Sequence, residues 1–431
     1  MQPDNASANK VLDLFDDYAQ YSVKDEYRAN LSALRSDVRG LISYESALKP
    51  LLDRADAIVN GYLKKDSRRE FSTDKNAENV INQYGNLRSY AGNTLKMSSF
   101  GINRQVLGIG GMTGQTITVY VEADDGDPLP SIAFTQVYGD WRSWQSSYSL
   151  SRGKNVLTVP NFITDNYTRQ VAAGGPIHIV NAYEPAQQSS NVKIYVEGGY
   201  LYPVFRKGGD VNSFRTELTS YYNKMGEEGI SDVVELVGDR FIHTVSATLA
   251  YNHYVAGTVD PQKNADGWDE YITALLEFGG VSMDANDEHY NEKNLHLYTN
   301  FRMVQPWAGA AAFAAGDHIG FITFSEGSMT NFGSPGWGIA HEIGHALDVN
   351  GRTIGETTNN MWSKFALAYF EHNVSRNFNA DMTNVMTPDE TAVDAGYFNT
   401  NTYNYQIWWN LEACHKGFWG ELDNMYRYFD E

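Results

Sequence analysis

The period of the hydrophobic pattern changes twice along this chain, and these changes limit the possible folds more than any other feature. Within residues 8–95, apolar side chains recur at helical spacing, as Tyr27 and Leu31 do. From about residue 96 to 206, short runs such as 116–121 alternate between two faces and are separated by clusters of Gly, Asn and Asp. That pattern is typical of an antiparallel β-sandwich.

Helical periodicity returns after residue 206. We expect helices over 213–226, 230–254 and 266–278, β segments at 295–298 and 319–324, and then at least three more helices, including 403–429. The sequence therefore predicts a multidomain α+β chain with three parts. These are an N-terminal helical segment (1–95), an antiparallel β-sandwich (96–206), and a mainly α-helical domain with a small β-sheet (207–431).

Charge and composition exclude several classes of function. The 431 residues include 53 acidic and 33 basic side chains, for a formal charge of −20. Phosphate binding draws its affinity from Lys and Arg, so we expect no nucleic-acid partner. No stretch approaches the ~18 consecutive apolar residues of a membrane span. Cys414 is the only cysteine, which excludes an internal disulfide, and the first seven residues lack the features of a signal peptide.

One segment combines the residue types that bind a metal. His341-Glu342-Ile343-Gly344-His345 has the pattern His-Glu-x-x-His within a stretch that reads as helix. Residues four apart on a helix lie on one face with Cβ atoms about 5–6 Å apart. Two imidazoles at that spacing can share one Zn²⁺ at about 2.0–2.1 Å. Glu342 projects beside the metal, where it can take a proton from a water that the metal holds.

A catalytic zinc needs a third protein ligand and one open position. Ten residues separate His345 from Glu356, which allows one helical turn, a stop at Gly351, a loop and the start of a new helix. We therefore predict a His₂Glu site, with Glu356 as the third ligand and one zinc per chain. Asn360 lies one turn further on the same face, where its amide can hydrogen-bond a ligand histidine and orient the ring.

Plainer roles exist for each of these residues. The two histidines could be hydrogen-bonded core residues without a metal. Glu356 could be an acid favoured by the dipole at a helix N-terminus, and Asn360 could be a cap or a surface residue.

Other patterns are weaker. Trp141, Arg142 and Trp144 could contact a sugar, although packing is the more common use of such aromatics. The glycine-rich stretch 107–114 lacks the Lys-Ser/Thr of a phosphate loop and reads as a hairpin turn. The stretch starting at Asp284 lacks the glycine of a calcium loop.

The sequence resembles the viral enhancins and the enhancin-like zinc metallopeptidases of gut and mucosal bacteria. The resemblance rests on 341–345 followed by Gly355-Glu356-Thr357-Thr358-Asn359-Asn360, and on stretches of the β region at 139–142, 174–181 and 196–199. It covers about residues 96–431. It implies a zincin-type catalytic domain of the gluzincin class over 207–431, with His341, His345 and Glu356 as zinc ligands and Glu342 as the general base. The family often has a polar residue such as Asn at the position of Ala346.

The resemblance also implies a substrate. Enhancin-like peptidases cleave peptide bonds in mucin-type O-glycosylated proteins, so we expect a secreted or cell-surface zinc endopeptidase, with the export signal not present in this chain. The strand at 319–324 could pair with an extended substrate. Two alternatives stay open, namely a glycan- or mucin-binding protein with a zinc site but little turnover, and an unspecialised zinc endopeptidase. An aminopeptidase is disfavoured because no Gly-x-Met-Glu-Asn segment is present.

Overall fold

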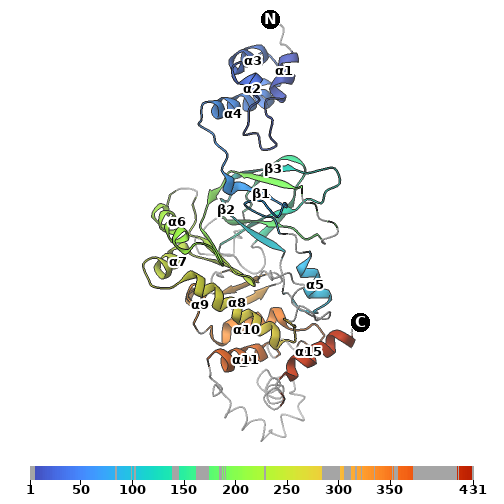
Figure 1. The fold of residues 1–431 in the computed structure, drawn as a ribbon, viewed down its shortest axis with the longest axis vertical. Helices are drawn as coiled ribbons and strands as arrows, with labels where there is room; N and C mark the ends of the chain where they lie inside the picture. Colours follow the sequence, from blue (N-terminus) through green and yellow to red (C-terminus); the bar gives the residue numbers. More distant parts are fainter. Residues whose placement is uncertain are drawn as a thin grey trace.

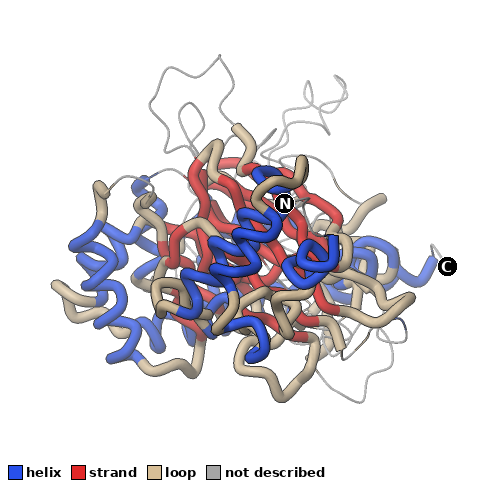
Figure 2. Tube along the Cα trace, turned by 90° about the horizontal axis from the view of Figure 1, so that it is seen from above, coloured by secondary structure: helices blue, strands red, loops and turns tan. Residues whose placement is uncertain are grey.

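The computed structural model describes most of the chain. The described residues are 5–82, 85–98, 100, 103–137, 145–161, 174–183, 187, 189, 191–227, 230–283, 301–304, 312–315, 318–321, 323–333, 335–351, 353, 358–371, 415 and 417–429. In this part of the chain, helices and strands are mixed, as the sequence predicts, and the molecule is elongated (Figure 1). Seen along its length, the strands gather in the middle with helices around them (Figure 2).

The first sixty residues form a small helical unit at one end of the molecule (Figure 1). Its elements are α1 (Asn5–Leu12), α2 (Asp25–Arg28), α3 (Leu31–Val38), a π-helical turn η1 (Tyr44–Leu48) and α4 (Lys49–Val59). Apolar residues at helical spacing close a separate core that includes Val11, Leu34 and Leu52. Arg54 of α4 joins this unit to the next by a bidentate ion pair with Glu197, at 2.9 and 2.7 Å.

The helical expectation for 8–95 is wrong between Val59 and Leu87, where the described residues form turns, a 3₁₀ turn at Ser67–Arg69 and a strand, but no α-helix. Residues 70–72 form strand β1 (Glu70–Ser72), which pairs antiparallel with β8 (Lys193–Glu197). Three residues are too few to show a period, and the pairing with a distant strand decides their conformation. After β1, the helix α5 (Leu87–Asn93) completes the first hundred residues.

Two antiparallel sheets follow and face each other across one core. The first has the order β1-β8-β3-β6 and the second the order β5-β4-β7-β2-β9. Their remaining strands are β2 (Arg104–Met112), β3 (Thr116–Glu122), β4 (Ser131–Thr135), β5 (Gln145–Ser149), β6 (Gly153–Thr158), β7 (Gly174–Val180) and β9 (Tyr200–Leu201). Alternate side chains from both sheets, such as Val119 and Ile177, share a single buried cluster. This arrangement is a β-sandwich, as the alternation predicts.

A six-stranded mixed sheet forms the framework of the third part, in the order β10-β11-β12-β13-β15-β14. Its strands are β10 (Val204–Arg206), β11 (Val234–Val237), β12 (Phe241–Val245), β13 (Phe301–Val304), β14 (Ala312–Ala315) and β15 (His318–Phe321). The helices around it are α6 (Val211–Lys224), α7 (Ala247–Tyr254), α8 (Pro261–Phe278), α9 (Thr323–Thr330), α10 (Gly336–Leu347), α11 (Asn360–Phe370) and α15 (Phe418–Phe429).

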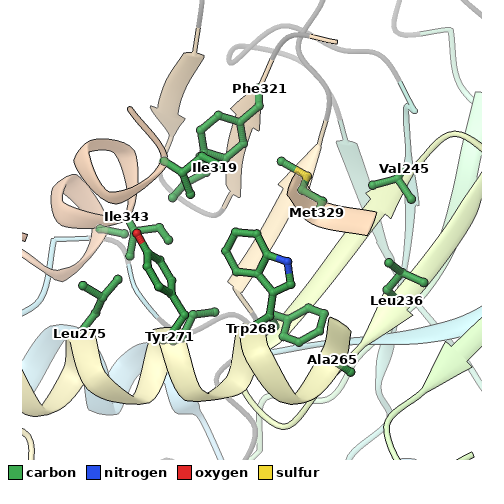
Figure 3. Close-up of a cluster of buried hydrophobic side chains, with 14 of the residues drawn as sticks. Leu236, Val245, Ala265, Trp268, Tyr271, Leu275, Ile319, Phe321, Met329 and Ile343 are labelled. Atoms are coloured by element: carbon green, nitrogen blue, oxygen red, sulfur yellow. The ribbon is translucent and has the colours of Figure 1, made fainter. Parts of the chain in front are cut away.

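Helix α8 carries the centre of the largest hydrophobic core. Trp268, Tyr271 and Leu275 extend from it toward the sheet and toward Ile343 of α10 (Figure 3). The same cluster contains residues that lie between β1 and β2 in sequence, namely Ala91, Leu95, Met97 and Phe100. The packing of residues 207–431 therefore depends on a segment from the first hundred residues.

Two expectations for this region are wrong. Residues 230–254 are not one helix, because β11, a turn at Gly238 and β12 come before α7. The strand expected at 319–324 ends at Phe321, and α9 starts at Thr323. The β segment expected at 295–298 lies outside the described residues. In the described part of the chain, no helix is long and apolar enough to cross a membrane.

Candidate active site

Helix α10 positions both motif histidines. Ile339, Ile343 and Leu347 are buried and fix which side of the helix packs inward. His341 and His345 lie one turn apart, with ring centroids separated by 4.8 Å and ring planes at 86°. The expected helical placement of the motif is confirmed.

A hydrogen bond from α11 orients the first ring. His341 Nδ1 lies 2.7 Å from Asn360 Oδ1, a carbonyl oxygen that can only accept. The ring nitrogen therefore donates, which assigns the tautomer with its proton on Nδ1. The lone pair of His341 is then on Nε2, the atom that can bind a metal. The structure thus brings Asn360 and His341 together.

The two Nε2 atoms lie near one atom, the amide nitrogen of Asn359, which is also 3.2 Å from Nδ1 of His341. The amide nitrogen of Asn359 lies 3.1 Å from Nε2 of His341 and 3.0 Å from Nε2 of His345. The oxygen of the same amide, Oδ1, is buried and has no hydrogen-bond partner among the described residues. An unsatisfied buried acceptor costs about 1–3 kcal/mol. Two neighbouring imidazole nitrogens beside an unsatisfied oxygen suit a cation better than an amide group.

The candidate base occupies the position that the motif implies. Glu342 follows His341 on α10 and is 9% exposed. A carboxylate that is mostly shielded from water, one residue from a metal ligand, fits the role of a proton acceptor in a peptidase.

A glycine allows α11 to begin close to α10. A Cβ atom added at Gly344 would overlap the carbonyl oxygen of Asn359 and lie 3.1 Å from its carbonyl carbon. The hydroxyl of Ser363 also donates to the carbonyl of Trp337 at 3.1 Å, which joins α11 to the first turn of α10. These contacts hold the residues just after Glu356 against the face of α10 that carries the histidines.

Several predicted site residues lie outside the described residues. These are Glu356 and the three candidate sugar contacts, Trp141, Arg142 and Trp144. Within the residues that the structure does describe, no group of three or more His, Cys, Asp or Glu side chains could hold a metal ion. The role of Glu356 as third ligand stays a prediction.

The sequence did not single out Asn359. Its neighbour Asn360 was chosen by helical spacing, but nothing in the sequence distinguishes which of two adjacent amides faces the second ring. Gly344 offered a signal, since a glycine within a helix often marks a close approach of another backbone.

The strand expected to receive a substrate is also different. β15 lies inside the sheet, parallel to β13 on one side and antiparallel to β14 on the other, so both of its edges are paired. β14 is the edge strand among those described, and it packs beside α10. The free edge nearest the motif helix therefore belongs to residues 312–315.

Comparison with known proteins gives matches in family and in structure. Residues 203–415 match the family model described as Peptidase M60, enhancin and enhancin-like. The catalytic module of the metalloprotease ZmpA from Clostridium perfringens is 26% identical, with a TM-score of 0.69, covering 83% of this chain and 69% of that one. No curated protein sequence matches the chain.

Two further structures from the same organism share the fold. A structure of ZmpB that contains CBM32-1, CBM32-2 and M60 catalytic domains is 23% identical, with a TM-score of 0.78 over 99% of this chain. The chain spans 44% of that structure. The M60 catalytic domain of ZmpC, in complex with the sialyl T antigen, is 24% identical, with a TM-score of 0.68, covering 80% of this chain and 69% of that one.

The family match covers α10 and the start of α11, which hold the His-Glu-x-x-His motif and the two asparagines beside it. Residues 203–415 thus match the enhancin-like M60 metallopeptidase family, and the fold matches that of the ZmpA catalytic module.

Proposed function

We propose that this protein is a zinc-dependent endopeptidase that hydrolyses peptide bonds in mucin-type O-glycosylated proteins. The observation that carries the proposal is that His341 and His345 stand one turn apart on α10, with both Nε2 atoms within 3.1 Å of one atom, on the helix that also carries Glu342. The proposed ligand set is completed by Glu356. Zinc would supply Lewis acidity for the scissile carbonyl and would lower the pKa of the attacking water.

The chain's own residues perform the remaining tasks. Asn360 keeps the proton of His341 on Nδ1, so that Nε2 stays available to the metal. Glu342 accepts a proton from the attacking water and later gives it to the departing amine. Among the described strands, β14 has a partner on one side only and lies next to α10, and an extended substrate can pair with its other side.

The same proposal assigns a part to each region. Residues 207–431 form the catalytic domain, with packing contributed by the segment around residues 91–100. The sandwich of residues 96–206 is an accessory domain, where Trp141, Arg142 and Trp144 are the candidate sugar contacts. The helical segment 1–95 extends the molecule beyond the sandwich. We propose a secreted or cell-surface location, since mucin-type substrates are extracellular.

The substrate assignment draws support from the ZmpC catalytic domain, which was solved with the sialyl T antigen. Two peptides of one sequence, one carrying an O-glycan and one bare, test it directly. Faster cleavage of the glycosylated peptide supports glycan recognition. Equal rates would indicate an unspecialised endopeptidase. Binding of the glycopeptide without turnover, in both wild type and Glu342→Gln, would indicate a glycan-binding protein.

A further inference from the structure

A buried carboxylate occupies an unfavourable position at the end of the motif helix. Asp348 follows Leu347 directly, ends α10 and is 1% exposed. A negative charge near a helix C-terminus opposes the helix dipole, and burial of the charge adds a further cost. A group placed against both preferences needs strong local partners.

The partners of Asp348 come from two different segments. Its Oδ2 accepts a hydrogen bond from the hydroxyl of Thr358, and its Oδ1 accepts one from the backbone N–H of Val349 at 3.1 Å. Its backbone carbonyl accepts from both the N–H and the hydroxyl of Ser98, each at 3.0 Å. Asp348 therefore joins the end of α10 to the start of α11 and to a segment 250 residues upstream.

The upstream segment forms a short ladder beside the end of α10. Met97 pairs antiparallel with Val349, and the N–H of Asn350 donates to the carbonyl of Lys96 at 2.7 Å. Lys96 has a φ of 54°, a conformation uncommon for residues other than glycine. Since the carbonyl of this strained residue accepts a hydrogen bond in the ladder, the pairing offsets the local conformational cost.

Three contacts fix the residues at the start of α11 along one face of α10. They pair the two segments in reverse order: His341 with Asn360, Gly344 with Asn359, and Asp348 with Thr358. Residues 341, 344 and 348 share one helix face because they are three and four apart. The Asp348 contact is the one closest in sequence to Glu356, which precedes Thr358 by two residues.

We propose that Asp348 and Thr358 are positioning residues for the metal centre. Their hydrogen bond fixes the chain immediately after Glu356, while the 96–98 segment fixes the chain immediately after α10. The described residues on either side of Glu356, 348–351 and 358–360, are then held in place, and we expect this to favour metal binding. The inference rests on the proposed zinc site.

The test is the zinc affinity of Thr358→Val, measured by competition with a chromophoric chelator. The variant keeps the shape of the side chain and removes only its hydroxyl. We expect zinc to bind about 10–100-fold more weakly, the usual effect of losing a contact that supports a ligand. The matched control is Thr248→Val, which removes another hydroxyl that donates to an aspartate, Asp232, at 2.9 Å. Its zinc affinity should equal that of wild type.

Two more variants separate positioning from general stability. Asp348→Asn keeps one side-chain oxygen that can accept from Thr358, so we expect it to bind zinc more tightly than Asp348→Ala does. The double variant Asp348→Ala/Thr358→Val should bind zinc no more weakly than the weaker single variant, because both changes remove the same interaction. Saturating zinc should restore kcat in Thr358→Val, which shows that the change weakens metal binding and leaves the folded enzyme competent.

Wild-type zinc affinity in Thr358→Val would overturn the proposal, as would an equal loss in Thr248→Val. Wild-type protein that holds no zinc would overturn the metal site together with this role. Weak zinc binding by Thr358→Val together with tight binding by wild type supports both the metal site and the positioning role.

Discussion

The metal-binding character of this site depends on which nitrogen of each histidine carries the proton. Asn360 Oδ1 settles this for His341, since a carbonyl oxygen accepts and leaves the lone pair on Nε2. The amide nitrogen of Asn359 lies near both Nε2 atoms, but it is equally close to Nδ1 of His341, at 3.2 Å, so it does not assign the protonation of either ring. The assignment for His341 therefore depends on Asn360.

Removal of one histidine should remove the metal. The purified protein should contain about one zinc per chain, because a His₂Glu set forms a single site. His345→Ala leaves two ligands, and metal analysis should find its zinc content close to zero. The surface variant His415→Ala is the control and should keep the full amount. If wild-type protein that has never been exposed to a chelator contains no zinc, the assignment is wrong.

Loss of the base should separate metal binding from turnover. Glu342→Gln keeps the size of the side chain but cannot accept a proton. We expect zinc content to stay at the wild-type level while kcat on a mucin-type substrate falls by about 10²–10⁴-fold. Parallel metal analysis and kinetics check this. An unchanged kcat would show that another group takes the proton from the attacking water.

Among the secondary-structure elements, α10 and α11 are as close as their side chains permit. Gly344 faces the backbone of Asn359 without a Cβ between them. Gly338 of the same helix has open space beside it, since a Cβ added there would meet no atom within 4 Å. Gly344 and Gly338 therefore differ in the space around them, and alanine at Gly338 is the control for alanine at Gly344.

Gly344→Ala should push the start of α11 away from the histidines. Overpacking of this kind costs about 1–3 kcal/mol of folding free energy and should also weaken zinc binding. Gly338→Ala should stabilise the protein by about 0.5–1 kcal/mol, because alanine favours the helix. Denaturant unfolding and chelator competition measure both effects. Equal stability and zinc affinity in the two variants would show that the backbone approach at Gly344 is not required.

A buried histidine in β12 should make the fold sensitive to acid. His243 stacks on Phe241 at 4.1 Å and meets Trp268 at 4.7 Å between ring centroids. Neither ring nitrogen has a hydrogen-bond partner among the described residues, and burial lowers the pKa of His243 to about 3. Below pH 6.5 the unfolded chain binds a proton that the folded chain does not, so stability falls as the pH drops toward 3.

The size of this effect is limited to about 1.4 kcal/mol per pH unit for one group. His243→Leu removes the titrating ring and should flatten the dependence of unfolding free energy on pH between 6 and 4 by up to that amount. Urea unfolding at several pH values compares the two proteins. Parallel curves for variant and wild type would mean that His243 is protonated in the folded state.

The sequence predicts best those helices and strands that bury one face and expose the other, because only these show a clear hydrophobic period. Sandwich strands such as β3 and β6 alternate, and α8 and α10 repeat at helical spacing, so the pattern identified them. The pattern does not identify β2, where nearly every residue is buried and where 107–114 reads as a hairpin turn. β11 and β12 were read as part of a helix because both faces of each strand are buried, which removes the alternation. The motif located the histidines, but the contact of Asn359 and the tie between Asp348 and Ser98 depend on tertiary packing across the chain.

At the scale of the whole molecule, the sandwich and the six-stranded sheet share a buried polar cluster. Glu235 of β11 is fully buried and accepts from Tyr202 and Thr244, each at 2.6 Å. His178 of β7, on the sandwich side, lies 3.0 and 3.2 Å from the two oxygens of the same carboxylate. One carboxylate thus links strands of two sheets, in a place where water cannot satisfy it.

Removal of the sandwich-side partner should therefore weaken the whole assembly. His178→Ala leaves the Glu235 carboxylate buried with one partner fewer, which we expect to cost about 3–5 kcal/mol of unfolding free energy. Seven of the nine tryptophans follow residue 206, so tryptophan fluorescence reports mainly on the peptidase region, while far-ultraviolet circular dichroism reports on the entire chain. If the two sheets unfold as one unit, both signals should shift together to lower denaturant.

The control is Lys193→Ala, which removes an exposed ion pair with Glu122 within the sandwich and should change stability by less than about 1 kcal/mol. Wild-type stability in His178→Ala, or a shift in the dichroism signal alone, would show that the peptidase region folds independently of the sandwich.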